Sequence, residues 1–213
     1  MPDVTMVTLQ ASGQTLWLLP ERAIFLPDSD TLIVADAHVG TNDDTLAVLS
    51  GLVRKLEATR IVFLGDFLHA ARSEPATMAA IVRWRERHSA LELTLIRSPL
   101  DPPIVEPPAM LDIQAFDEPV MHRGIAMCHR PQPIRGAFVL AGHVSPCVSI
   151  RGRARDRPRM PCFWFSLRQC VLPAFGTSTE MQSIKPTRGQ RIFAAANGRV
   201  VELQPRPKPP SAG

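Results

Sequence analysis

The sequence lacks long hydrophobic runs and a basic leader, and each absence excludes a class of protein. No apolar stretch in the 213 residues approaches the ~18 to 20 residues that a membrane-spanning helix requires. Residues 1–14 carry polar side chains throughout and lack the positively charged start of a signal peptide. We therefore expect a cytoplasmic protein that has no membrane partner.

Cysteine is scarce, and its spacing excludes the common cysteine-based sites. The four cysteines include no C-x-x-C pair of the kind that marks a zinc ribbon or a redox motif. They are Cys128, Cys147, Cys162 and Cys170. We expect free thiols that are buried.

Lysine is also scarce, so the positive charge comes almost entirely from arginine. Of the 24 basic residues only three are lysine, which leaves 21 arginines, and the net charge is +4. A dense run, RGRARDRPR, covers residues 151–159. Because the arginine guanidinium suits phosphate groups, Arg151, Arg153 and Arg155 are candidates for nucleic-acid binding. A solvated hairpin loop would explain the same run.

Hydrophobic periodicity predicts alternating strands and helices in the first half of the chain. Short strand-like runs lead into an apolar strand at Leu32–Ala35, and apolar residues then recur at helical spacing over residues 43–60. A strand at Ile61–Leu64, a helix starting near Pro75 and a strand within residues 91–98 follow. This order predicts a parallel sheet with crossover helices, whose functional residues lie at the carboxyl ends of the strands.

The second half of the chain is predicted to be all-β. Short strand-like runs beyond Pro102 are separated by turn signals at Arg123-Gly124 and Asn197-Gly198. The last residues, 205–213, are rich in proline and are expected to be disordered. We find no internal repeat and expect one domain over residues 1–204.

Acidic and histidine side chains follow several of the apolar strands. Asp36 and His38 come after the first, Asp66 after the second, and His129 and His143 after two later ones. Because alternate side chains of a strand point the same way, we expect Asp36 and His38 to converge on one cation from one edge of a sheet. On its own that pair could be a helix cap and a partly buried polar residue. Together the five residues favour a metal site for Mn²⁺, Fe or Zn²⁺.

These motifs resemble those of the calcineurin-like metallophosphoesterases, whose pattern runs D-x-H, G-D-x-x, G-N-H-D, a later histidine and G-H-x-H. More narrowly, the chain resembles the bacterial ligase-associated DNA-damage-response phosphoesterase, also described as an endonuclease. The narrower resemblance rests on LIVADAHVG, GDFLH, the spacing to His129, AGHVSP and CFWFSLRQCVLPAFGTSTEMQSI. It covers about residues 15–203.

The resemblance implies a fold, a metal site and partners. The fold would be α/β, a four-layer α/β/β/α sandwich. Asp36 and His38 would bind one metal, Asp66 would bridge two, and His129 and His143 would bind the second. Asp36, Asp66 and His129 would be the catalytic group, with Mn²⁺ as the expected ion and Fe or Zn²⁺ as alternatives. The substrate would be DNA or another phosphate ester, and the repair partners a DNA ligase and an exonuclease.

Three residues of the family pattern are missing from this chain. Where G-N-H-D is expected, Pro99 replaces the metal-binding asparagine and Leu100 the catalytic histidine, while Asp101 is retained. Ser145 replaces the second histidine of G-H-x-H. We therefore expect partial metal occupancy and reduced activity. Four residues are candidates to support the site without binding the metal: His69, Asp101, Ser145 and Arg97. For Arg97, a surface ion pair is the more common use.

Two functional hypotheses follow. The first is a metal-dependent phosphoesterase, a phosphodiesterase or endonuclease associated with DNA repair, and it rests on the five retained ligand positions. The second is a catalytically inactive protein of the same fold that binds DNA or a repair partner, and it rests on the three losses.

Overall fold

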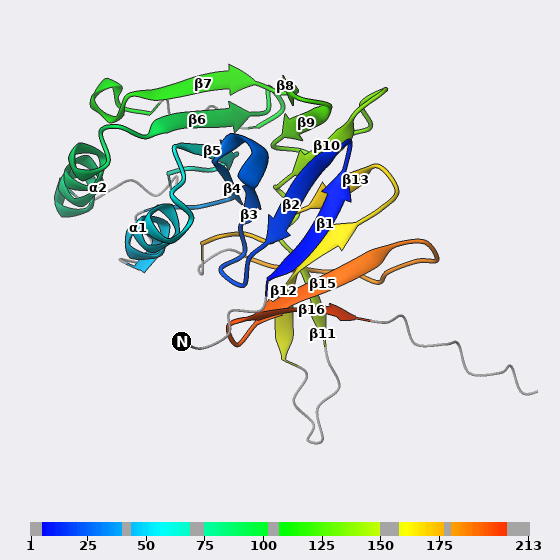
Figure 1. Ribbon diagram of the computed structural model, residues 1–213. Helices are drawn as coiled ribbons and strands as arrows, with labels where there is room; N and C mark the ends of the chain where they lie inside the picture. The colour runs from blue at the N-terminus through cyan, green and yellow to red at the C-terminus, as the bar shows by residue number, and fades with distance from the viewer. Residues whose placement is uncertain are drawn as a thin grey trace, which may run out of the picture.

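Two β-sheets pack face to face, and two α-helices cover the outer face of the first sheet (Figure 1). The computed structural model describes residues 6–39, 44–68, 75–101, 107–149, 158–176 and 180–203. The expected α/β class with two stacked sheets is confirmed. Within the described ranges, α-helices cover only the first sheet, so the outer face of the second carries no helix there.

The first sheet has seven strands in sequence order. Neighbouring strands are antiparallel from the first to the fourth and parallel from the fourth to the seventh. The strands are β1 (Val7–Ala11), β2 (Gln14–Leu18), β3 (Ile24–Leu26), β4 (Thr31–Ala35), β5 (Arg60–Leu64), β6 (Glu92–Arg97) and β7 (Ile113–Asp117). The predicted parallel unit is confirmed over β4 to β6, whereas the sequence patterns did not predict β1.

The two α-helices cross over between the parallel strands. Helix α1 (Asp44–Leu56) joins β4 to β5, and α2 (Pro75–Arg87) joins β5 to β6. Leu49 and Leu52 of α1, with Ile81 and Trp84 of α2, face the sheet and are buried. Two short 3-10 helices, η1 (Pro27–Ser29) and η2 (Ala109–Leu111), complete the helical segments of the described chain. Neither α-helix, at 13 residues each, is long and apolar enough to cross a bilayer.

The second sheet has nine strands and mixes parallel with antiparallel pairs. Its central strands run in the order β14-β11-β12-β13-β10-β9-β8, and β15 pairs with β12 and β16. The strands are β8 (Val120–His122), β9 (Ile125–Cys128), β10 (Phe138–Ala141), β11 (Pro146–Ser149), β12 (Arg159–Phe165), β13 (Gln169–Val171), β14 (Gln182–Ser183), β15 (Arg191–Ala196) and β16 (Arg199–Leu203). Left-handed residues at Arg123-Gly124 and Asn197-Gly198 confirm the two predicted hairpin turns.

The side chains of β4 alternate between two hydrophobic cores, one on each face of the first sheet. Ile33 and Ala35 face the second sheet, while Leu32 and Val34 face α1 and α2. All four are fully buried, which explains why β4 reads as a continuous apolar run. The same division continues in β5, where Val62 faces the second sheet. Packing against the second sheet on one face and against the helices on the other therefore fixes the position of the carboxyl ends of these strands.

A substitution at Phe163 tests the core between the sheets, because Phe163 is fully buried there in one cluster with Phe165 and Phe193. We expect Phe163→Ala to lower the free energy of unfolding by about 3 to 5 kcal/mol, through reduced burial and the cavity left behind. Leu167→Ala is the control, since Leu167 is 89% exposed, and should change stability by less than about 0.5 kcal/mol. Urea denaturation measures both. Equal effects would contradict this role of Phe163 in the core.

Candidate metal centre

The predicted ligands gather where strands of both sheets end. Asp36 directly follows β4, Asp66 lies two residues after β5, His129 directly follows β9 and His143 lies two residues after β10. Strands β4 and β5 are parallel neighbours, as are β9 and β10, so each pair has its carboxyl ends at one edge of its sheet. Contacts of Asp36 with His129 and with the His143 backbone bring these two edges together at one rim of the sandwich. The structure thus brings together residues that are more than 100 positions apart in the chain.

The backbone at this rim adopts an uncommon conformation. Asp36, His38, His143 and Ser145 all have positive φ values, of 46°, 43°, 67° and 47° respectively. The prediction that strand alternation aligns Asp36 with His38 was therefore wrong, because β4 ends at Ala35 and both residues lie in left-handed turns. Such conformations are costly for residues other than glycine and cluster at functional sites.

Asp36 is almost fully buried, at 2% exposure, and its carboxylate is hydrogen-bonded by the second sheet. The backbone N–H of His143 and the hydroxyl of Ser145 donate to Oδ2 at 3.0 and 3.3 Å. Oδ1 lies 3.3 Å from Nε2 of His129. Ser145, which replaces an expected histidine, therefore orients the carboxylate of Asp36.

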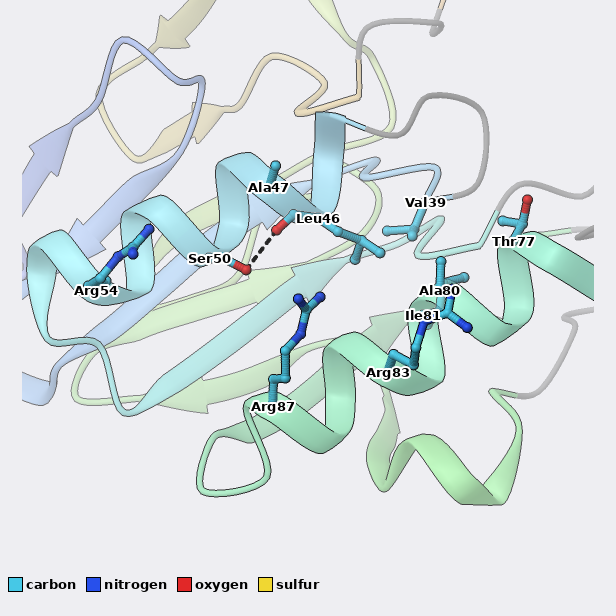
Figure 2. A pocket seen from close by; sticks show the side chains of 10 residues that line it. All are labelled: Val39, Leu46, Ala47, Ser50, Arg54, Thr77, Ala80, Ile81, Arg83 and Arg87. Carbon is cyan, nitrogen blue, oxygen red and sulfur yellow. Dashed lines mark hydrogen bonds between the residues drawn. The ribbon is translucent and has the colours of Figure 1, made fainter.

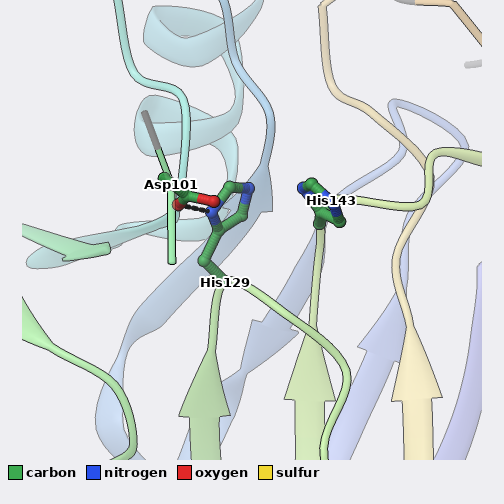
Figure 3. A group of neighbouring side chains, drawn as sticks. All are labelled: Asp101, His129 and His143. Atoms are coloured by element: carbon green, nitrogen blue, oxygen red, sulfur yellow. Dashed lines mark hydrogen bonds and ion pairs between the residues drawn. The ribbon is translucent and has the colours of Figure 1, made fainter. Parts of the chain in front are cut away.

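His129 lies between two carboxylates. Its Nδ1 is hydrogen-bonded to Asp101 Oδ2 (Figure 3), while Nε2 faces Asp36. The ring is 1% exposed. Burial lowers the pKa of His129, but the hydrogen bonds and charges of Asp36 and Asp101 more than offset this and raise it to about 9. Without a bound cation, His129 is thus protonated at neutral pH.

Two groups of donor atoms lie close enough to hold a cation. One oxygen or nitrogen from each of Asp36, Asp66 and His129 lies within 4.8 Å of the others, and the same holds for Asp101, His129 and His143. His38 belongs to neither group, although its Nε2 lies 3.9 Å from Asp66 Oδ2. The division of the five residues between two ions stays a prediction.

His143 stands beside His129 but differs from it electrostatically. The two rings meet edge to face with centroids 5.0 Å apart, above the ends of the neighbouring strands β9 and β10 (Figure 3). His143 is exposed. Its pKa is lowered by partial burial and by the charges of Arg130 and His129, which outweigh the carboxylates nearby. A neutral imidazole is the form that binds a metal.

Arg130 is a member of the site that the sequence patterns did not identify. Its Nε donates to Asp101 Oδ1 at 2.9 Å, and its backbone N–H donates to Glu118 Oε2 at 2.8 Å. Burial alone would raise the pKa of Asp101, but the hydrogen bonds and charges of His129 and Arg130 lower it below its usual value. The only sequence signal for Arg130 was its place directly after His129.

The remaining residues that the sequence analysis singled out, where the structure describes them, do not contribute donor atoms to either group. Arg97 donates from Nε to Asp117 Oδ1 at 2.8 Å across β6 and β7, which is the ion pair considered for it. Pro99 and Leu100 are exposed, Leu100 at 78%, and neither side chain offers a donor atom. His69, the arginines Arg151, Arg153 and Arg155, and the tail 205–213 lie outside the described residues.

Two glycines make room for the site. Gly65 has a φ of +75°, and a Cβ there would lie 2.0 Å from Cδ2 of His129. A Cβ on Gly142 would lie 2.9 Å from the Ala35 Cβ and the Leu64 carbonyl oxygen. The glycines of the two motifs G-D and G-H are thus required by the close approach of the two sheets.

Comparison with solved structures identifies the family. The Pseudomonas putida nuclease MPE is 39% identical to this chain and superposes with a TM-score of 0.85, over 93% of this chain and 100% of that one. The chain belongs to the metallophosphoesterase superfamily. YfcE, a phosphoesterase from E. coli, is 11% identical with a TM-score of 0.43, over 83% of this chain and 99% of that one. No protein-family model matches the chain, and a search of curated proteins finds no match.

The metallophosphoesterase superfamily consists of hydrolases that act on phosphate esters, and the donor set of this member suits the divalent metal that such hydrolases use. Asp101 holds Nδ1 of His129, which leaves Nε2 directed at Asp36. A histidine ligand ordinarily gives its other ring nitrogen to a carboxylate in this way. The buried carboxylate of Asp36 adds an oxygen donor, held by a hydroxyl and a backbone N–H that leave its negative charge in place.

The raised pKa of His129 predicts a pH-dependent stability of the metal-free metallophosphoesterase. Because the folded pKa of about 9 exceeds the usual 6.5, protonation of His129 stabilises the fold fully below pH 6.5. This contribution disappears as the pH rises through 9. With a chelator present, we expect the free energy of unfolding to fall across this window by on the order of 2 to 3 kcal/mol.

The matched variant is Asp101→Asn, which removes one of the two charges that raise the pKa of His129. Its stability should depend less on pH over the same window, as measured by urea denaturation at several pH values. The same pH dependence in both proteins would contradict this role of Asp101 and His129.

Proposed function

We propose that this metallophosphoesterase is a phosphodiesterase that cleaves the backbone of nucleic acid in the manner of an endonuclease. The observation that carries the proposal is the convergence of Asp36, Asp66 and His129, whose donor atoms lie within 4.8 Å of one another. The similarity to a nuclease over nearly the whole chain supports nucleic acid as the substrate class. Asp66 is half exposed, so the group opens to solvent and to a phosphate.

The side chains of the protein supply binding and orientation. Asp36, Asp66 and His129 would hold a divalent ion, for which we propose Mn²⁺, because carboxylate and imidazole ligands suit it. Such an ion, when bound, neutralises charge that develops on the phosphoryl oxygens and lowers the pKa of water. Asp101 and Arg130 fix the His129 ring, and Ser145 and the His143 backbone fix the Asp36 carboxylate.

We propose that turnover is slow. The segment that should supply an asparagine ligand and an acidic imidazole ends in Pro99 and Leu100, and both side chains are exposed and lack donor atoms. The same observation favours the second candidate function, an inactive metallophosphoesterase fold that binds DNA or a repair partner. By resemblance we further propose a cytoplasmic role in DNA repair, with a DNA ligase and an exonuclease as partners.

Asp36→Asn tests the proposed function. The change keeps the shape of the side chain but removes its charge, so we expect hydrolysis of bis(p-nitrophenyl) phosphate with Mn²⁺ to fall by about 100-fold. Asp30→Asn is the control, because Asp30 also has a left-handed φ of 46° but lies at the opposite end of β4 and is exposed. Absence of hydrolysis by the unaltered protein at every Mn²⁺ concentration would favour the inactive alternative.

Restoring the missing motif provides a separate test. Because positions 99 and 100 are exposed, the double variant Pro99→Asn, Leu100→His should be accommodated without disturbing the packing. We expect kcat for the same diester to rise by about 100-fold if the new imidazole acts as a general acid. An unchanged kcat in a folded double variant would show that these two substitutions do not limit the reaction.

A further inference from the structure

A groove between α1 and α2 starts beside the candidate metal centre. It has a volume of about 490 Å³ and begins at Val39, one residue beyond His38 (Figure 2). Leu46 of α1 and Ile81 of α2 line it near this end, and both helices start at the rim that carries the site. A ligand in the groove would therefore lead away from the reacting centre along the helices.

Three arginines also line the groove. Arg54 comes from α1, and Arg83 and Arg87 come from α2 (Figure 2). All three are exposed, and none forms an ion pair with a carboxylate among the residues that the structure describes. Other basic residues of the helices differ: Lys55 lies 4.0 Å from Glu21, and Arg85 lies 3.1 Å from Asp112.

The arginines concentrate positive charge at one place. Arg83 and Arg87 are four residues apart and share one helical face, an arrangement that is unfavourable for like charges without an anion nearby. The helix dipoles favour Arg54 and Arg87, which lie in last turns, but not Arg83, which lies earlier. Burial first, and then the charges of Arg87, Arg54 and Arg85, lower the pKa of His88 at the end of α2.

The dimensions of the groove match a nucleic-acid strand. From Leu46 to Arg54 helix α1 rises by about 12 Å at ~1.5 Å per residue. This corresponds to roughly three to four nucleotides at ~3.4 Å per step of one strand of B-DNA. We infer that the α1–α2 groove binds the phosphodiester backbone of the nucleic acid whose scissile bond lies at the metal centre. This inference rests on the proposed function.

Binding without cleavage tests the groove. In the presence of a chelator, a fluorescein-labelled DNA duplex of about 20 base pairs is titrated at several salt concentrations between about 50 and 200 mM. We expect the triple variant Arg54→Gln, Arg83→Gln, Arg87→Gln to weaken binding by about tenfold or more. The slope of log affinity against log salt is negative, and its magnitude should decrease by about 2.7, that is, by ~0.9 for each arginine that no longer neutralises a phosphate.

The control removes the same charge elsewhere. Arg135, Arg188 and Arg199 are exposed and lie outside the groove, and their triple change to glutamine should keep the slope of the unaltered protein. Equal weakening in both triple variants, or full binding by the groove variant, would overturn the inference. If the groove variant does not fold, as judged by its thermal melting, the three single variants replace it, and each should decrease the magnitude of the slope by about 0.9.

The same measurements separate this inference from the proposed function. Hydrolysis of bis(p-nitrophenyl) phosphate by the unaltered protein reports on the metal centre alone, because so small a diester cannot reach the arginines. Hydrolysis of the diester together with full DNA binding by the groove variant would refute the groove and leave the function standing. Weakened binding by the groove variant without any hydrolysis by the unaltered protein would support nucleic-acid binding in the groove and refute the proposed phosphodiesterase function.

Discussion

The burial of the Asp36 carboxylate is the constraint on which the candidate site depends. A buried carboxylate is costly unless hydrogen bonds compensate it. Asp36 directly follows β4 of the first sheet, yet its donors, the His143 backbone and the Ser145 hydroxyl, lie in the turn between β10 and β11 of the second. The segment after β13 completes the contact, because the Phe175 and Gly176 backbone N–H groups donate to the carbonyl oxygens of Ala35 and Asp36. Hydrogen bonds to Asp36 and Ala35 therefore hold the two sheets together at this rim.

An alternation of charge extends outward from Asp36. The carboxylate faces His129, His129 faces Asp101, and Asp101 faces Arg130. Each group stabilises the charge of its neighbour, and the contacts of Asp36 and Asp101 hold the imidazole in one orientation. Exposed Asp66 lies at the open side of this chain of contacts. The arrangement is prepared for a cation on the Nε2 side of His129. By the family pattern, what it lacks at Pro99 is a metal-binding asparagine, and what it lacks at Leu100 is an imidazole.

Local patterns predicted most of the fold, and the motifs predicted four residues whose donor atoms converge, Asp36, Asp66, His129 and His143, whereas His38 belongs to neither group. Apolar periodicity identified α1, α2 and β4 to β6, and glycine turns identified two hairpins, because these signals lie within a few residues of each other. The left-handed conformations of Asp36 and His38 were not predictable from local patterns, since they accompany contacts with distant residues: the His143 backbone N–H donates to the Asp36 carboxylate, and the His38 backbone N–H donates to the Asp66 carbonyl oxygen. Arg130 and the groove arginines were also missed because their roles depend on contacts between distant parts of the chain. Arg54 and Arg87 line one groove only because α1 and α2 lie side by side on the sheet.

Anomalous diffraction from crystals grown with Mn²⁺ tests the central claim most directly, because it locates the ion without relying on activity. We expect an anomalous peak bounded by Asp36, Asp66 and His129, with Asp101 still bonded to Nδ1 of His129. A peak held by other residues, or none at saturating Mn²⁺ with the contact between His129 and Asp36 unchanged, would contradict the claim.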